Sequence, residues 1–494
     1  MSDIPKKRPR TRLLRNWISF GGGIIALGSL FAFLLLFAID LFAHHRNPYM
    51  GILAYVIAPG FLALGLGLVF IGLWWQRRLE RRGAPGAATQ FLVIDLSRRR
   101  HRQTLWAFIG AAVLFLLATA MGSYNTYHYT ESVQFCGQAC HTPMKPEFTA
   151  YLNSPHARVD CVACHVGEGA SAYVQSKVNG VHQLIGVITG DYDRPIKTPV
   201  KNLRPAQDTC EKCHWPNRYA GNLDRTYAHY LADETNTVFN VRLSLKVGGG
   251  DAKHGPPGGI HWHMNIANKV EYIATDHQRQ VIPWVRVTDS AGVVTEYRTS
   301  SFTNDPASYT IRQMDCMDCH NRPAHHFRPP NDSVNLAMST GQIDPALPWV
   351  KSNAVALLIQ SYATESEAME KISRSLRTAY PKAQQVDKLV AAVQDIYKQN
   401  FFPEMKADWR AYPDNIGHKN WAGCFRCHDG LHKATTGKRM IPASDCNSCH
   451  TILAQGSGAQ LTELSAKGHT FFHLDANYED FSCINCHNGA FIKE

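Results

Sequence analysis

Seven pairs of cysteines, each followed directly by a histidine, constrain this chain more than any other feature of its sequence. All 14 cysteines belong to such a pair. The pairs with their histidines are Cys136, Cys140 and His141; Cys161, Cys164 and His165; Cys210, Cys213 and His214; Cys316, Cys319 and His320; Cys424, Cys427 and His428; Cys446, Cys449 and His450; and Cys483, Cys486 and His487. A c-type haem requires two thiols that form thioethers with its vinyl groups and an imidazole that binds its iron. The sequence therefore predicts seven covalently bound haems c.

Zinc sites and disulfides are the common explanations of one isolated cysteine pair. With 24 histidines among 494 residues, chance would place one after every second cysteine with a probability on the order of one in a billion. Zinc also pairs such cysteine units two by two, and seven is an odd number. We therefore interpret the pairs as haem attachment sites.

Three apolar stretches near the N-terminus, at about 17–42, 50–75 and 104–123, are long enough to cross a bilayer. The first stretch lacks the short core and cleavage site of a signal peptide, so we expect a retained helix. The connector at 76–103 holds eight arginines, whereas the connector at 43–49 holds one. The positive-inside rule then places the N-terminus and residues 76–103 in the cytoplasm, and everything after Ser123 outside. We expect a multi-pass protein of the bacterial inner membrane with its haems in the periplasm.

The net charge of +11 belongs to the predicted membrane part. Residues 1–122 carry 15 Lys and Arg against 4 Asp and Glu, whereas the remaining residues carry 36 of each. We interpret the basic excess as a topology signal, and expect no nucleic-acid partner. The propionates of seven haems would make the outer part acidic, which favours a basic or weakly docking redox partner.

The histidines nearest to the predicted spans all lie at their ends: His44, His45, His101 and His128. A haem b inside the bilayer would need axial ligands at depth. We therefore expect no haem b and no electron transfer across the membrane through this chain. His44 and His45 lie in the predicted outer connector, and we interpret them as loop residues.

We predict a membrane-anchored haem protein with three transmembrane helices and a mostly helical or irregular outer part with a small β-containing insert. Its segments are a basic N-terminus (1–16), a transmembrane hairpin (17–75), a basic cytoplasmic loop (76–103), a third transmembrane helix (104–123), the part with haems 1–3 (124–220), the insert (221–315), haem 4 with a Pro-rich linker (316–330), a helical module (331–410) and the part with haems 5–7 (411–494).

Local patterns predict several elements of the outer part. Alternating residues at 281–287 and 293–299, joined across Asp289 to Gly292, predict a hairpin, and residues 238–247 predict another strand. Thr364 with Glu367 predicts a capping box for a helix that ends near Tyr380. Apolar residues from Val386 to Tyr397 keep helical spacing.

Histidines outside the motifs can supply the second axial ligand of each iron. The 24 histidines less the seven in motifs leave seventeen, which is enough for every distal position. Two histidine ligands would give low-potential transfer haems. The first candidates are His156, His182, His263, His418, His432 and His469, and the reserves are His229, His261, His325, His326 and His473.

Residues 104–215 resemble the NapC/NirT family of membrane-anchored quinol dehydrogenases. The resemblance rests on an apolar span that runs into a haem motif followed closely by Met144, and on Ser154-Pro155-His156 before the second motif. The later haems, with Ile260-His261-Trp262-His263 and the stretch from Cys424 to His432, resemble the larger seven-haem inner-membrane members associated with metal-respiring bacteria.

The resemblance implies functions for several residues near the first haem. In the family a methionine shortly after the first motif binds the iron beside the quinol pocket, a role that falls on Met144. This chain has three residues instead of two between Cys136 and Cys140, and Met144 is three instead of two after His141, so His141 and Met144 both stay candidate ligands. The resemblance also implies a lysine and an acid after the second haem to take up quinol protons. The candidates are Lys177 with Asp191 or Asp193.

The resemblance implies a quinol dehydrogenase, with menaquinol the expected substrate, that passes electrons to a periplasmic redox protein such as a cytochrome c. Two alternatives remain open. The chain could be an electron wire within a larger complex whose other subunit oxidises the quinol. It could also be a terminal reductase of nitrite, hydroxylamine or a sulfur oxyanion, although the CxxCK motif that would point to one is absent.

Overall fold

The structure is a computed structural model that describes residues 17–42, 58–81, 97–166, 170–200, 203–215, 221–248, 258–264, 268–436 and 446–472. His44, His45, His473 and the last motif, Cys483 to His487, lie outside the described residues. The chain divides into two compact units. One comprises Met1–Thr130 with Val166–His182, and the other comprises Glu131–His165 with Gln183–Glu494.

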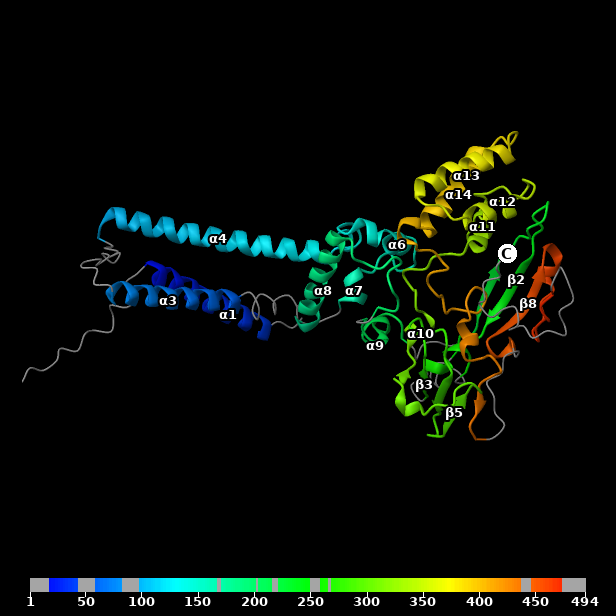
Figure 1. The fold of residues 1–494 in the computed structure, drawn as a ribbon, viewed down its shortest axis with the longest axis horizontal. Helices are drawn as coiled ribbons and strands as arrows, with labels where there is room; N and C mark the ends of the chain where they lie inside the picture. The colour runs from blue at the N-terminus through cyan, green and yellow to red at the C-terminus, as the bar shows by residue number, and fades with distance from the viewer. Residues whose placement is uncertain are drawn as a thin grey trace, which may run out of the picture. The chain divides into compact units, whose positions relative to one another are not determined.

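Two apolar helices, α1 (Trp17–Phe42) and α3 (Ala58–Arg81), lie side by side in the first unit (Figure 1). Glycines allow their close approach. A Cβ added at Gly22 would lie 2.6 Å from the carbonyl oxygen of Gly65, and one added at Gly65 would lie 2.5 Å from the backbone nitrogen of Ala26. The Ser19 hydroxyl donates a hydrogen bond to the Val69 carbonyl oxygen at 3.2 Å. The contacts run in opposite directions along the two helices, so the pair is antiparallel.

By length and composition, two helices among the described residues could cross a membrane. Their apolar windows are Trp17–Leu34 and Ala58–Arg78, each with a mean hydropathy of 1.8. The predicted third span, 104–123, lies within the single long helix α4 (Arg99–Glu131). Several side chains of that stretch are outside the described atoms, so the third span stays a prediction. The helix α8 (Ala170–Thr189) begins in the same unit.

A five-stranded antiparallel sheet in the second unit has the order β6-β3-β4-β5-β7. Its strands are β3 (Lys269–Ile273), β4 (Trp284–Thr288), β5 (Val294–Arg298), β6 (Arg312–Gln313) and β7 (Lys433–Ala434). Strands β4 and β5 form the predicted hairpin. Its turn is closed by the Asp289 carboxylate, which accepts hydrogen bonds from the backbone of Ala291 and Val293 at 2.9 Å, and Gly292 adopts a positive φ of 77°.

A smaller antiparallel sheet combines β1 (Leu223–Tyr227), β2 (Asn240–Leu245) and β8 (His450–Gly456). The strand predicted at 238–247 contains β2. Strands β8 and β7 come from the C-terminal part of the chain, yet each completes a sheet begun by the insert. The buried residues Phe239, Val241 and Ile452 form the apolar core of the smaller sheet.

The helical module contains four helices, α11 (Pro330–Ser339), α12 (Val350–Ile359), α13 (Glu365–Ala379) and α14 (Val386–Asn400), which gather in one cluster in Figure 1. Their shared core is fully buried at Val334, Val350, Leu358, Ile372, Leu376 and Val393. At the start of α13, the Thr364 hydroxyl accepts a hydrogen bond from the backbone of Glu367 at 3.2 Å. The Glu367 carboxylate accepts from Ala363 at 2.7 Å, so the returning bond of the predicted capping box is shifted by one residue.

Short helices hold most of the cysteine motifs. They are α5 (Val133–Gln138), α6 (His141–Leu152), α7 (Cys161–His165), α9 (Ala206–Thr209), α10 (Cys316–Cys319) and the 3₁₀ turns η3 (Cys210–Lys212), η8 (Gly423–Arg426) and η9 (Cys446–Ser448). Further 3₁₀ turns are η5 (Ile260–Met264), η6 (Pro306–Ser308), η7 (Pro403–Met405) and η10 (Gly458–Thr462).

Candidate haem sites

One helical turn gathers the functional groups in three of the motifs. The backbone N–H of the motif histidine bonds to the carbonyl oxygen of the first cysteine in His214–Cys210 (2.8 Å), His320–Cys316 (2.8 Å) and His428–Cys424 (3.0 Å). The turn brings two thiols and one imidazole close together. In the first motif, the additional residue divides the group between two helices: Cys136 lies in α5, whereas Cys140 caps α6.

Five motif histidines lie opposite a second histidine from another part of the chain. The ring centroids are separated by 6.1 Å for His165 and His325, 6.1 Å for His214 and His156, 6.2 Å for His320 and His261, 5.9 Å for His428 and His263, and 6.3 Å for His450 and His418. A metal bound by two imidazoles through bonds of about 2 Å each would hold the ring centroids roughly 6 Å apart. The spacing therefore fits an iron between the rings of each pair.

Hydrogen bonds to Nδ1 orient four of the distal histidines. The acceptors are the backbone carbonyl oxygens of Pro323 for His156 (3.1 Å), Val247 for His261 (3.1 Å), Ile260 for His263 (2.8 Å) and Glu147 for His325 (3.0 Å). Metal-bound histidines in proteins commonly donate their other ring N–H in this way, which fixes the tautomer and the ring direction. Such a bond leaves Nε2 available for iron.

Burial favours the neutral form of four motif histidines, which is the form that binds metal. Burial lowers the pKa of His428 to about 4, with the nearby His263 as a smaller cause. It also lowers the pKa of His165, of His320 and of His450 below the ordinary histidine value.

The cysteine thiols place consecutive motifs beside one another. A hydrogen bond from Cys136 lowers the pKa of Cys161 to about 7. Burial raises the pKa of Cys164, and the neighbouring Cys210 raises it further. Burial raises the pKa of Cys316 to about 11, again with Cys210 as the next cause. The motifs numbered one to four along the chain are therefore neighbours in the same order.

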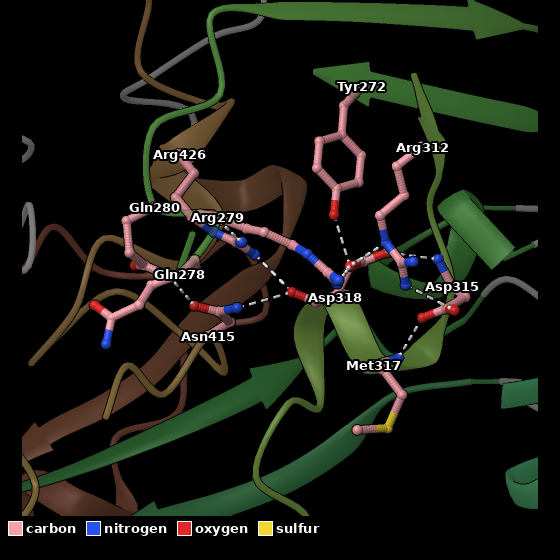
Figure 2. A network of polar contacts seen from close by, with 10 residues as sticks. All are labelled: Tyr272, Gln278, Arg279, Gln280, Arg312, Asp315, Met317, Asp318, Asn415 and Arg426. Atoms are coloured by element: carbon pink, nitrogen blue, oxygen red, sulfur yellow. Dashed lines mark hydrogen bonds and ion pairs between the residues drawn. The ribbon is translucent and has the colours of Figure 1, made fainter. Parts of the chain in front are cut away.

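A buried polar network connects the fourth motif to the fifth (Figure 2). Asp318, between the cysteines of the fourth motif, is only 3% exposed. Its carboxylate accepts hydrogen bonds from Tyr272 (2.7 Å), Arg279 (3.0 Å) and Arg312 (3.0 Å). Arg426, between the cysteines of the fifth motif, donates to the backbone carbonyl oxygen of Asp318 at 2.7 Å.

This network was not expected from the sequence. Arg426 also donates to the carbonyl oxygens of Gly423 and Arg279, both at 2.9 Å. Its guanidinium therefore ties the two attachment segments together through backbone acceptors. The available signal was a pair of opposite charges between the cysteines of consecutive motifs, Asp318 and Arg426.

Of the first candidates for distal ligands, His156, His263 and His418 lie opposite motif histidines, and so do the reserves His261 and His325. His432 does not fit a ligand role. Its Nδ1 contacts the Asp429 carboxylate at 2.7 Å and its Nε2 contacts the Ile282 carbonyl oxygen at 2.8 Å. Both ring nitrogens are thus engaged with the protein, which corrects the expectation that nearness to a motif makes His432 a ligand.

The other candidate histidines are placed differently. His182 and His469 are exposed, and Nε2 of His469 lies 3.3 Å from the Glu463 carbonyl oxygen. Nδ1 of His229 lies 3.2 Å from the Asn335 side-chain nitrogen, and His326 pairs with Asp414 at 3.0 Å. The structure places none of these four opposite a motif histidine among the side chains that it describes.

The residues implied in quinol oxidation lie near the first two motifs along the chain. Met144 is half-buried in α6, and its N–H bonds to the Cys140 carbonyl oxygen at 3.1 Å. Lys177, half-buried in α8, donates to the Thr130 hydroxyl at 3.3 Å. Asp191 is exposed, and Asp193 pairs with Lys197 at 3.0 Å. The His141 side chain is outside the described atoms.

Comparison with known proteins shows the family of this chain. The family described as "NapC/NirT cytochrome c family, N-terminal region" matches residues 98–214. Cytochrome c-type protein ImcH of Geobacter sulfurreducens (strain ATCC 51573 / DSM 12127 / PCA) is 40% identical over 489 residues, which cover 96% of this chain and 94% of that protein. No solved structure matches the chain. The chain belongs to the NapC/NirT family of membrane-anchored multihaem c-type cytochromes.

Proposed function

We propose that this cytochrome is a quinol dehydrogenase that oxidises quinol, most simply menaquinol, at the periplasmic surface and relays the electrons through seven haems c to a periplasmic acceptor. The observation that carries the proposal is the set of five histidine ring pairs about 6 Å apart in consecutive motifs. The first motif of the chain, which precedes the five motifs with ring pairs, follows the helix α4, whose apolar stretch is the third proposed membrane span. Three spans with a cytoplasmic N-terminus put that motif at the outer surface.

We assign the distal ligands from the ring pairs. His325 serves the second haem, His156 the third, His261 the fourth, His263 the fifth and His418 the sixth. When bound, a haem with two imidazole ligands supplies one-electron transfer and offers no open position to a substrate. For these five sites the chain itself therefore opposes the terminal-reductase alternative, which needs an accessible iron.

The distal ligands also support an order for the relay. His156 stands five residues before Cys161, so one segment serves both the second and the third haem. His261 and His263, which share the turn η5, serve the fourth and fifth haems. His418 precedes Cys424 by six residues, so one segment serves the fifth and the sixth haems. Shared segments keep successive haems close, and short separations favour rapid electron transfer.

The proposed quinol site combines Met144, as a candidate iron ligand beside His141, with Lys177 and Asp191. Quinol oxidation releases protons together with electrons, so the site requires a group that holds the hydroxyl and a group that accepts a proton. In this proposal the Lys177 ammonium holds the quinol oxygen. The exposed Asp191 carboxylate accepts the two protons of the quinol one after the other and releases each to the periplasm, while the two electrons leave the quinol one at a time.

The substitution Lys177→Ala tests the proposal in the full-length protein purified in detergent. We expect the variant to lose haem reduction by a menaquinol analogue and to keep full reduction by dithionite. Lys398→Ala, which removes an exposed lysine of α14 paired with Asp395 at 3.8 Å, is the matched control and should behave as the wild type. Stopped-flow absorbance of the haem α-band measures both reactions.

Two results would contradict the proposal. Unchanged quinol kinetics in Lys177→Ala would remove that residue from the site. Failure of the wild type to accept electrons from the quinol analogue in the absence of other proteins would favour the alternative of an electron wire within a larger complex.

A further inference from the structure

One of the four oriented distal histidines differs from the others in having a charged group beside its ring. For His156, His261 and His263, the group that contacts Nδ1 is a neutral backbone carbonyl. Nδ1 of His325 is likewise hydrogen-bonded to a backbone oxygen, that of Glu147, at 3.0 Å, but the carboxylate of the same residue also lies 3.1 Å from this nitrogen. The proposed distal ligand of the second haem is therefore the one of these four with a carboxylate beside its Nδ1.

A buried arginine holds this carboxylate in place. Arg322, with 8% of its side chain exposed, donates to both carboxylate oxygens of Glu147 at 3.2 and 3.1 Å. Its Nε donates to the backbone oxygen of His325 at 2.8 Å. The guanidinium carbon also lies over the rings of Tyr412 at 4.2 Å and Phe327 at 5.0 Å from their centroids. The arrangement fixes Glu147 and His325 against each other.

A carboxylate beside a bound imidazole acts through its charge. A nearby negative charge stabilises a positively charged group, so it favours the ferric state of an iron bound to this imidazole over the ferrous state, which lowers the reduction potential. The Arg322 cation weakens this effect through its own field, but the carboxylate is the charge in contact with the ring nitrogen.

We infer that Glu147 lowers the reduction potential of the second haem relative to the third, fourth and fifth, through the charge of its carboxylate beside Nδ1 of His325. Because the second motif lies between the first and the third, the second haem would be a step of low potential early in the relay. An electron that has passed it would meet a barrier to return. Glu147 is thus a positioning residue that gives the relay a direction, and the inference rests on the ligand assignments proposed above but not on quinol oxidation.

The test is a redox titration of the full-length holoprotein that follows the individual haem transitions by absorbance and electron paramagnetic resonance. His325→Met changes the axial ligand of the second haem and should raise its midpoint potential, because methionine ligation raises haem potentials. This variant identifies the transition of the second haem. Glu147→Gln keeps a polar acceptor of the same size but removes the charge, and we expect it to shift that same transition upward.

The matched control is Glu365→Gln. Glu365 forms an ion pair with Lys145, which lies in α6 two residues before Glu147. The control therefore also removes one carboxylate charge close to this helix, but not the one beside His325. We expect the control to leave the transition of the second haem at its wild-type potential.

The outcomes separate the inference from its premises. If Glu147→Gln matches the wild type while His325→Met shifts one transition, the inference about Glu147 is wrong and the ligand assignment stands. If His325→Met shifts no transition, the ligand assignment itself fails. If Glu147→Gln does not retain haem, Glu147→Asp serves as the second variant, because it keeps the charge but moves it away from the His325 ring by one methylene. A smaller upward shift in that variant then supports the inference, and an unshifted transition overturns it.

Discussion

At the scale of residues, the partners of the two ring nitrogens distinguish a candidate iron ligand from a structural histidine. His263 and His432 both lie near His428. Nδ1 of His263 bonds to the carbonyl oxygen of Ile260, three residues earlier in its own turn, whereas His432 uses both nitrogens for protein contacts. The contact that excludes His432 comes from Ile282, far away in the sequence. Spacing along the chain could not reveal it.

This difference predicts opposite effects of two alanine substitutions. His263→Ala should remove a ligand of the fifth haem and give a high-spin ferric signal in electron paramagnetic resonance. His432→Ala should leave all haems low-spin. It should still lower the free energy of unfolding by about 1–3 kcal/mol, because it leaves the buried Ile282 carbonyl oxygen without this donor. A high-spin signal in His432→Ala would show that this histidine does bind iron.

A buried lysine of the helical module predicts a pH dependence. Burial lowers the pKa of Lys351 from 10.5 to about 8, with Lys419 lowering it further and Asp332 and Asp233 raising it. The Lys351 ammonium contacts the Tyr230 carbonyl oxygen. The unfolded chain therefore binds a proton more readily than the folded chain between about pH 8 and 10.5. Burying the charged Lys351 ammonium lowers the free energy of unfolding, and this cost is fully present below about pH 8. The free energy of unfolding should therefore rise with pH between about pH 8 and 10.5.

Denaturant titration of the holoprotein at several pH values checks this effect. Lys351→Met should abolish the part of the pH dependence that arises from this group. Lys388→Met, at an exposed position where the ammonium bonds to the Gly341 carbonyl oxygen at 2.9 Å, should retain it. Equal pH profiles in the wild type and Lys351→Met would refute the assignment.

At the scale of elements, the sequence predicts what depends on neighbouring residues and misses what depends on distant ones. The β4–β5 hairpin and the helix from Glu365 were predicted because their turn and cap are local. The pairing of β7 and β8 with the edges of the two sheets was not predicted, because their partner strands are distant in the sequence and no local pattern identifies them. Of the four helices in the module, local patterns predict α13 and α14, because the short α11 and α12 lack a long periodic pattern.

The contact between α1 and α3 gives a prediction at this scale. Gly22→Leu should force the helices apart, because an added Cβ would lie 2.6 Å from the Gly65 carbonyl oxygen. Gly21→Leu is the matched control, because nothing lies within 4 Å of a Cβ there. Thermal denaturation in detergent should show a lower midpoint for Gly22→Leu alone. Equal midpoints would mean that the close packing of these helices contributes nothing to stability.

At the scale of the whole molecule, the positions of the cysteine motifs were sufficient to predict a multihaem c-type cytochrome, because haem attachment needs residues that are adjacent in sequence. The family followed from the resemblance of residues 104–215. The distal ligands were predicted only as a pool. Each proposed ligand lies opposite a motif histidine from another part of the chain, as with His156 and His214 or His325 and His165, and a single sequence contains no record of such distances. The contacts of the charged residues Asp318, Arg426 and Glu147 were not predicted for the same reason.

The crossing of ligands between distant segments has a consequence for how this protein can be made and altered. If His325 is the ligand we propose, a nascent chain that ends after the second motif still lacks it, and the second iron site would wait for more than a hundred further residues. Maturation enzymes would then work on half-built sites. For the same reason, shortening the chain stepwise from its C-terminus would not yield a set of smaller working cytochromes.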